Sequence, residues 1–150
     1  MATARVSSLI GAPVSEVFSM FTDIEKAAAQ VSGIRKVERL TPGSFGLGTR
    51  WLETREVLGR LDDAEMEVTA IEWNRLCRIT HHKGGVRIDA EFTFEPAPEG
   101  TKVSVEFAMD RGGLPPGLLA PIEWAINSKV RDVLKGDLED LKQSIEKAAH

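Results

Sequence analysis

The side chains that could do chemistry gather on one predicted strand, residues 49–57. Trp51, Glu53 and Arg55 alternate along it, and side chains two residues apart on a strand lie on the same side, roughly 6.5–7 Å apart. If that side faces the interior, the two charges must pair, bind water or bind a ligand, because an unpartnered buried charge costs several kcal/mol. Such a pair would orient a polar head group or an enolate-forming ketone in an apolar pocket. The alternative is a twist or bulge that leaves both side chains in solvent.

A second cationic candidate, Arg78, lies on the predicted strand at residues 76–82, whose alternation leaves two arrangements open. In one, Arg78 points inward and shares the chemistry. In the other, Cys77 and Ile79 lie in the core and Arg78 is exposed, which the apolar character of the two neighbours favours. A thiol in the middle of a strand is typically an inert small hydrophobe, so Cys77 is not expected to be a nucleophile.

No metal or cofactor site is predicted. His81 and His82 are neighbours on a strand and point to opposite faces, so they cannot share a metal ion. The glycine-rich residues 43–48 lack the following helix and the lysine of a phosphate-binding loop, which indicates a hairpin turn. The chain contains no tyrosine, so no phenol is available as a proton donor.

The elements that must position these residues follow from the spacing of apolar side chains. The chain begins with a predicted strand over residues 5–10, a short helix over residues 13–22 and a second helix over residues 23–30. Residues 34–110 then alternate with period two and are interrupted by turn residues at five places. This pattern predicts six antiparallel strands in sequence order, in a sheet with one apolar and one polar face.

After Gly113 the apolar period returns to 3.6 residues, which predicts one long helix from Leu118 to Ile145. Pro121 must lie in its first turn or kink it, because a proline deeper inside removes a backbone hydrogen bond. The charged residues of this helix are expected on its solvent-facing side: Lys129, Arg131, Asp132, Lys135, Asp137, Glu139, Asp140 and Lys142.

These elements predict an α+β fold in which the sheet curls around the long helix, since only then can all the apolar surfaces be buried. A strongly curved sheet does not touch a straight helix everywhere, and the remaining hollow suits a small apolar ligand. Each apolar residue of the inner face could line this hollow or belong to a plain core. The candidates for the wall are Phe45, Trp51, Met66, Val68, Phe92, Phe94, Phe107, Met109 and Trp124, with Asn127 as a hydrogen-bond donor at the inner edge of the helix.

Length and composition limit the class of protein. The chain has 150 residues, of which 42% are hydrophobic and 28% charged, which is typical of one globular domain over residues 1–150. A formal charge of -4 gives no reason to expect a nucleic-acid partner. No apolar run approaches the roughly eighteen residues that span a bilayer, and one cysteine cannot form an internal disulfide. We expect a cytoplasmic protein without integral membrane association, and the oligomeric state, a homodimer included, stays open.

Seven short segments follow one another along the chain: Ala12–Phe18, Thr22–Asp23, Gly48–Trp51, Gly59–Arg60, Ala64–Thr69, Phe92–Pro96 and Gly100–Thr101. With the closing leucine-rich helix they resemble the polyketide cyclase/dehydrase and lipid-transport family of the START/Bet v 1-like (SRPBCC) superfamily. The resemblance implies a helix-grip fold, with seven antiparallel strands around the C-terminal helix and a deep cavity for a hydrophobic or amphipathic molecule. Relatives with this fold transport lipids, bind steroids or plant hormones, or cyclise polyketides, so the fold indicates a pocket and little chemistry.

Three functions remain open at this point. The first is a carrier or binding protein for a hydrophobic or amphipathic, lipid- or polyketide-like molecule. The second is an enzyme similar to polyketide aromatase/cyclases, in which Arg55 or Arg78 would stabilise an enolate and Glu53 would move protons. The third is a protein-interaction module with no ligand in its core.

Overall fold

The computed structural model describes residues 2–57, 59–83, 85–110 and 131–149. In these ranges three helices are present: α1 (Val14–Thr22), α2 (Ile24–Gln30) and α4 (Arg131–Ala149). The strands of the same ranges are β1 (Ala2–Ile10), β2 (Ile34–Arg39), β3 (Arg50–Val57), β4 (Arg60–Glu72), β5 (Leu76–Lys83), β6 (Val86–Ala97) and β7 (Gly100–Asp110).

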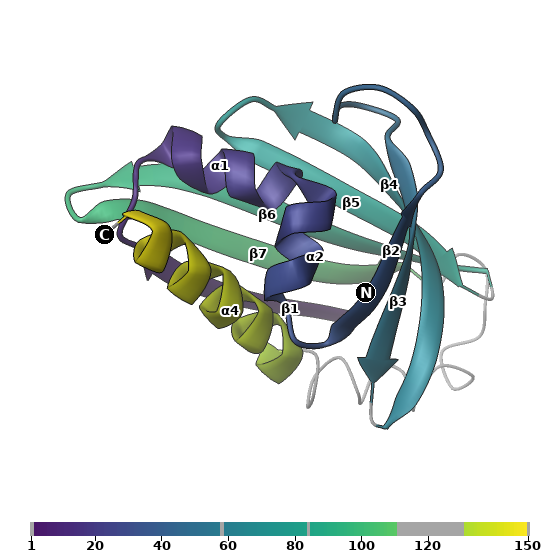
Figure 1. Ribbon diagram of the computed structural model, residues 1–150. Helices are drawn as coiled ribbons and strands as arrows, with labels where there is room; N and C mark the ends of the chain where they lie inside the picture. The colour runs from purple at the N-terminus through teal and green to yellow at the C-terminus, as the bar shows by residue number, and fades with distance from the viewer. Residues whose placement is uncertain (1, 58, 84, 111–130, 150) are drawn as a thin grey trace.

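The strands form one antiparallel sheet in the order β1-β7-β6-β5-β4-β3-β2 (Figure 1). The predicted meander over residues 34–110 is confirmed, and β1 closes the sheet by pairing with the last strand, so that Val6 lies opposite Val105. Turn residues stand where the alternation is interrupted. Gly59, for example, has a φ of +78° in the β3–β4 turn, a conformation that glycine adopts without strain. Local sequence therefore determines the strands and the order from β2 to β7, whereas the place of β1 depends on its pairing with the distant strand β7.

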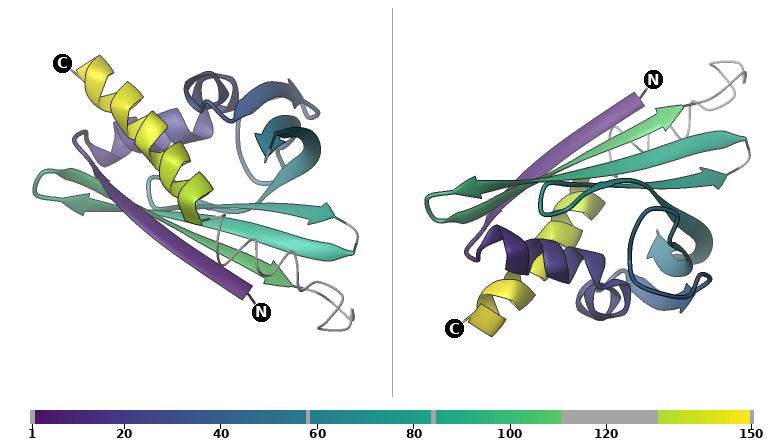
Figure 2. Two further views of the ribbon diagram at one scale, coloured as in Figure 1. Left: turned by 90° about the horizontal axis from the view of Figure 1, so that it is seen from below. Right: turned by 90° about the horizontal axis from the view of Figure 1, so that it is seen from above.

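The three helices lie on one side of the sheet, toward which β2 and β3 curl (Figure 2). The α1 helix packs on β6 and β7, the α2 helix on β2, and the α4 helix mainly on β1. Asp23 caps α2 as its residue type suggests, since its Oδ1 accepts a hydrogen bond from the Lys26 amide at 3.2 Å. The expected seven-stranded helix-grip fold of the Bet v 1/START type, with two short helices after the first strand, is confirmed.

Hydrogen bonds hold the described part of α4 near its C-terminus and at its middle. Near its C-terminus, Glu146 accepts a hydrogen bond from the Gly11 amide at 2.7 Å, and Lys142 donates one to the Leu9 carbonyl at 2.9 Å. At the middle of the helix, Asp140 accepts hydrogen bonds from both the amide and the hydroxyl of Ser32, each at 3.1 Å. These contacts fix which side of α4 faces the sheet. The predicted start of this helix, residues 118–130, lies outside the described residues and includes Pro121.

The main core fills the space between the sheet and the helices. At its centre the ring of Phe18 meets that of Phe94 edge to face, at 5.1 Å between centroids. Phe18 also contacts Trp73 at 5.1 Å between centroids, but Trp73 is exposed and lies outside the core. Val68 is fully buried in this cluster and Met66 packs against it. A second cluster, Ala4, Val86 and Met109 with Ile88 and Phe107 packed against it, holds β1, β6 and β7 together.

Candidate functional site

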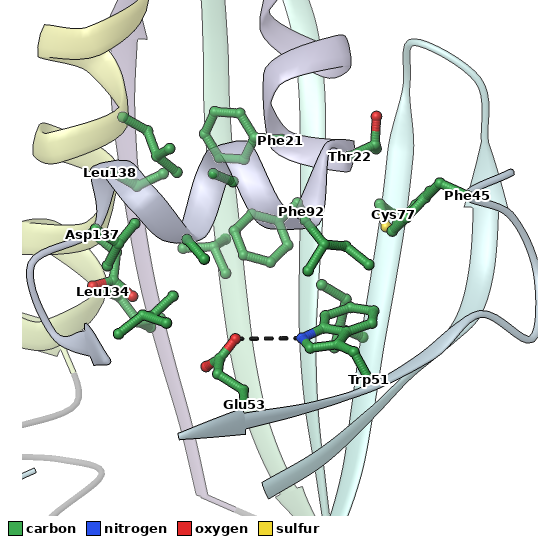
Figure 3. Close-up of a pocket in the computed structure, with 18 of the residues that line it drawn as sticks. Phe21, Thr22, Phe45, Trp51, Glu53, Cys77, Phe92, Leu134, Asp137 and Leu138 are labelled. Atoms are coloured by element: carbon green, nitrogen blue, oxygen red, sulfur yellow. Dashed lines mark hydrogen bonds between the residues drawn. The ribbon is translucent and has the colours of Figure 1, made fainter. Parts of the chain in front are cut away.

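A cavity of about 130 Å³ lies between α2, α4 and the inner face of the sheet (Figure 3). A cavity of about 150 Å³ in another protein accommodates benzene, so this one has room for a molecule of about one ring. Most of its wall is apolar. The residues lining it are Phe21, Thr22, Ile24, Ala27, Ala28, Val31, Ile34, Phe45, Trp51, Glu53, Arg55, Cys77, Ile79, Phe92, Phe94, Val105, Leu134, Asp137, Leu138 and Leu141.

Three charged side chains, Glu53, Arg55 and Asp137, meet at one end of this cavity. The guanidinium of Arg55 donates through Nε to Glu53 at 3.4 Å and through Nη1 to Asp137 at 3.1 Å. The indole Nε1 of Trp51 points at the remaining oxygen of Glu53 from 3.5 Å (Figure 3). The carboxylates keep 11% and 24% of their side chains exposed. We call Glu53, Arg55 and Asp137 the charged triad.

The β3 strand places two members of the charged triad. Because its side chains alternate, Trp51, Glu53 and Arg55 share the face that turns toward the helices. The cross-strand neighbours of Glu53 are Val37 and Ala64, neither of which can hydrogen-bond a carboxylate. Its hydrogen-bond partners are Arg55 and Trp51, both on its own strand.

The α4 helix supplies the third member. Asp137 lies three residues after Leu134 and four before Leu141, so it shares their side of the helix. Gly33, at the entry to β2, lies beside the guanidinium, since a Cβ atom there would stand 3.4 Å from Nη1 of Arg55, an ordinary contact distance. The charged triad thus joins residues 82 positions apart in the chain.

Burial and mutual charge shift the pKa values of Arg55 and Asp137. Burial alone would lower the pKa of Arg55, but Asp137 and then Glu53 together outweigh it, and the pKa lies above its ordinary value. Burial raises the pKa of Asp137, the charge of Arg55 opposes this, and the negative charges of Glu53 and Asp140 add to the rise. One guanidinium shared by two carboxylates does not fully compensate both, which leaves Asp137 with a raised pKa.

Asp137→Asn is expected to remove part of the pH dependence of stability. Because the pKa of Asp137 in the folded chain lies above the ordinary value of 3.8, the folded chain keeps this proton after the unfolded chain has released it. The wild type therefore loses stability relative to the variant as pH rises from 3.8 through the raised pKa. Urea denaturation of both proteins over the acid range measures this, and a difference that stays constant with pH would contradict it.

Cys77 and Ile79 both line the cavity. Of the two arrangements open for this strand, β5, the structure has the one in which these two residues point inward and Arg78 points outward. Burial raises the pKa of the Cys77 thiol to about 12. At neutral pH the thiol is protonated, so Cys77 is part of the apolar wall and does not supply a nucleophile.

The structure brings some of the predicted site residues together and separates others. Arg78 is turned away from the cavity, where its Nε donates to the hydroxyl of Thr69 at 3.0 Å, so it cannot share the chemistry of the charged triad. The predicted residues that do line the cavity are Phe45, Trp51, Glu53, Arg55, Phe92 and Phe94.

The other apolar candidates lie elsewhere. Met66 and Val68 belong to the main core, and Phe107 and Met109 to the second cluster, so none of the four is among the cavity-lining residues described above. Alternation identified their face of the sheet correctly, but the helices enclose only part of that face. Trp124 and Asn127 lie outside the described residues.

The expectation that Asp137 faces solvent is wrong, because it lies in the cavity wall and binds Arg55. The helical pattern contained the relevant information, since Asp137 is spaced like a member of the apolar stripe that includes Leu134 and Leu141. The sequence patterns also gave no indication that residues of α1 and α2, such as Ile24 and Ala27, line the cavity.

The described part of the chain lacks the features of a metal cluster and of a membrane-spanning helix. Within residues 2–57, 59–83, 85–110 and 131–149, no group of three or more His, Cys, Asp or Glu side chains could hold a metal ion. Of the helices described there, none has the length and apolar character needed to cross a membrane.

Comparison with known proteins adds a family and a set of related folds. No curated protein matches the chain. Among solved structures, TTHA0849 from Thermus thermophilus is 20% identical, with 99% of each chain covered and a TM-score of 0.78. The Zhui aromatase/cyclase from Streptomyces sp. R1128 is 15% identical, with 99% of this chain and 95% of that chain covered and a TM-score of 0.76. Ara h 8.0201 is 17% identical, with 95% and 96% covered and a TM-score of 0.71.

At these identities the likeness concerns the fold, and it agrees with the helix-grip arrangement of the sheet and α4. The sequence itself carries the family. Residues 1–146 match the family described as polyketide cyclase/dehydrase and lipid transport, and the chain belongs to that family.

Proposed function

We propose that this protein binds or carries a small hydrophobic molecule with one polar end in the cavity between the sheet and α4. The observation that carries the proposal is an apolar cavity of about 130 Å³ with a charged triad at one end. Apolar walls with a few convergent polar groups are the usual composition of a small-molecule site. The apolar part of the ligand would replace water against Phe92 and Leu138, and its polar end would meet the charged triad.

A carrier accounts for the chemistry of the wall better than an enzyme with a covalent step. The thiol of Cys77 is protonated at neutral pH, and Arg55 already binds two carboxylates. Binding requires only shape, apolar surface and a polar end, all of which the cavity offers.

The second candidate is a cyclase-type enzyme, as in the Zhui aromatase/cyclase with which the chain shares its fold. One observation favours it: Asp137 has a raised pKa and lies beside a cavity, which suits a group that exchanges protons with a bound ketone. Glu53→Gln and Asp137→Asn should then abolish turnover of a poly-β-ketone while the fold is retained. Unchanged turnover in both variants would exclude this role for the charged triad.

Filling the cavity from α2 is expected to weaken ligand binding at least about tenfold, which corresponds to about 1.4 kcal/mol. Ala27 lines the cavity, and a leucine there would occupy space that the ligand needs. Ala29, on the same helix, is exposed and absent from the cavity wall, so Ala29→Leu is the matched control. Titration with an apolar fluorescent probe measures both variants against the wild type.

Native mass spectrometry of protein purified from its host tests the proposal directly. A retained organic molecule that is present in the wild type and in Ala29→Leu, and lost in Ala27→Leu, would place the ligand in this cavity. Equal retention by both variants would show that the molecule binds elsewhere, and the proposal would fail.

A further inference from the structure

The polar end of the cavity offers more hydrogen-bond acceptors than donors. Each carboxylate of the charged triad has two acceptor oxygens, and Arg55 is the one cation among the described residues of the wall. Its Nε is directed to Glu53 and its Nη1 to Asp137. With two carboxylates and one guanidinium, the formal charge of this end is negative.

The other polar groups of the wall do not reverse this balance. The hydroxyl of Thr22 donates to the Phe18 carbonyl at 2.8 Å, within its own helix, so its proton is already used. The indole of Trp51 approaches Glu53 only to 3.5 Å, longer than a typical N–H···O hydrogen bond, which leaves that carboxylate oxygen able to accept a shorter one. Cys77 offers a thiol, a weak donor.

We infer that the cavity selects ligands whose polar end is a hydrogen-bond donor, a hydroxyl or a protonated amine, and discriminates against carboxylates and phosphates. The inference rests on the proposed binding function and specifies the ligand class for that same site. A ligand carboxylate would bring a third anion to one guanidinium in an apolar surrounding, where like charges interact strongly. A hydroxyl would instead donate to Glu53, and an ammonium group would also balance the negative charge.

Four one-ring probes of matched size test the inference: benzylamine, benzyl alcohol, toluene and benzoate. Their size suits a cavity of about 130 Å³. Binding to the wild type is followed by changes in the amide NMR spectrum at neutral pH, where benzylamine is protonated and benzoate is ionised. We expect benzylamine and benzyl alcohol to bind at least about tenfold more tightly than benzoate.

Changing the charge of the triad should invert this order. In the double variant Glu53→Gln/Asp137→Asn the two carboxylates become neutral amides and Arg55 keeps its charge, so benzoate should gain at least about tenfold and benzylamine should lose affinity. The single variants Glu53→Gln and Asp137→Asn should lie between the wild type and the double variant. Asp132→Asn removes a carboxylate from an exposed position of α4 that is outside the cavity, and it should leave the order unchanged.

The outcomes distinguish the inference from the function on which it rests. Wild-type protein that binds benzoate as tightly as benzyl alcohol would overturn the donor preference and leave the binding function standing. If none of the four probes, toluene included, binds to the wild type, the proposed function fails and the inference fails with it. The wild-type series decides the matter even if the double variant does not fold.

Discussion

Gly100→Ala is expected to lower the free energy of unfolding by about 2–6 kcal/mol, the sum of about 1–3 kcal/mol for a strained backbone and about 1–3 kcal/mol for overpacking. Gly100 has a φ of +145°, a region closed to residues with a Cβ atom. A Cβ atom there would overlap the carbonyl oxygen of Ile10 and lie 2.9 Å from the amide nitrogen of Ala12. Both are backbone atoms, so no side chain can move aside.

The effect should reach the cavity, because this contact fixes the start of α1. The β6–β7 turn lies against the segment between β1 and α1, where the fully buried hydroxyl of Thr101 donates to the Ala12 carbonyl at 2.8 Å. The α1 helix that follows contributes Phe21 and Thr22 to the cavity wall. Urea denaturation measures the loss of stability.

Gly46→Ala is the matched control for this substitution. Gly46 is not among the described glycines with positive φ, and a Cβ atom there would meet nothing within 4 Å. A change there of less than about 1 kcal/mol is expected, in the stabilising direction, since alanine reduces the freedom of the unfolded chain. If Gly100→Ala behaves like Gly46→Ala, the close approach of the β6–β7 turn to Ile10 does not exist in solution.

The strands β2 to β7 and their order could be predicted from sequence because their determinants are local. Alternation marks each strand of residues 34–110, turn residues such as Gly59 mark where it reverses, and consecutive antiparallel strands then pair in order. The two short helices were equally predictable from their apolar spacing and from the cap at Asp23. None of these features depends on residues distant in the chain.

The site was only partly predictable because it depends on contacts between distant elements. The alternation of β3 linked Glu53 and Arg55 to the face of Trp51, and the structure shows that this face turns inward. Which residue of α4 would meet them depends on how that helix is rotated, and this is fixed by contacts such as Asp140 to Ser32, 108 residues apart. A charged residue beside an apolar stripe is usually solvated, and Asp137 is the exception because Arg55 is its partner.

The charged triad is better explained by binding than by stability. Two carboxylates that share one guanidinium leave a buried excess of negative charge. Apolar side chains of similar volume often stabilise a protein at least as well as such a buried ionic group does. The raised pKa of Asp137 shows the same cost, since burial disfavours its charged form. An arrangement that costs stability at the end of a cavity is typical of a functional site.

Arg55→Met is expected to lower the free energy of unfolding by about 3 kcal/mol, the lower end of the range of about 3–5 kcal/mol for breaking a buried ion pair. Glu53 and Asp137 would be left facing each other without a cation, and their exposed fractions of 11% and 24% give only limited access to water. The loss should shrink as pH falls into the acid range, because protonation of Asp137, whose pKa is already raised, relieves the repulsion between the two carboxylates. Urea denaturation at neutral pH and at acid pH measures it.

Two comparisons separate this effect from the loss of any arginine. Arg50, on the opposite face of β3, pairs with Glu65 at 3.2 Å, and about half of each side chain is exposed. Arg50→Met should therefore cost less than about 1 kcal/mol. Replacing the whole triad, as Glu53→Leu/Arg55→Met/Asp137→Leu, should recover the stability lost in Arg55→Met, because none of the three charges of the triad then remains. A triple variant no more stable than Arg55→Met would mean that the charges contribute to the fold itself. Ligand binding would then not explain why the triad is present.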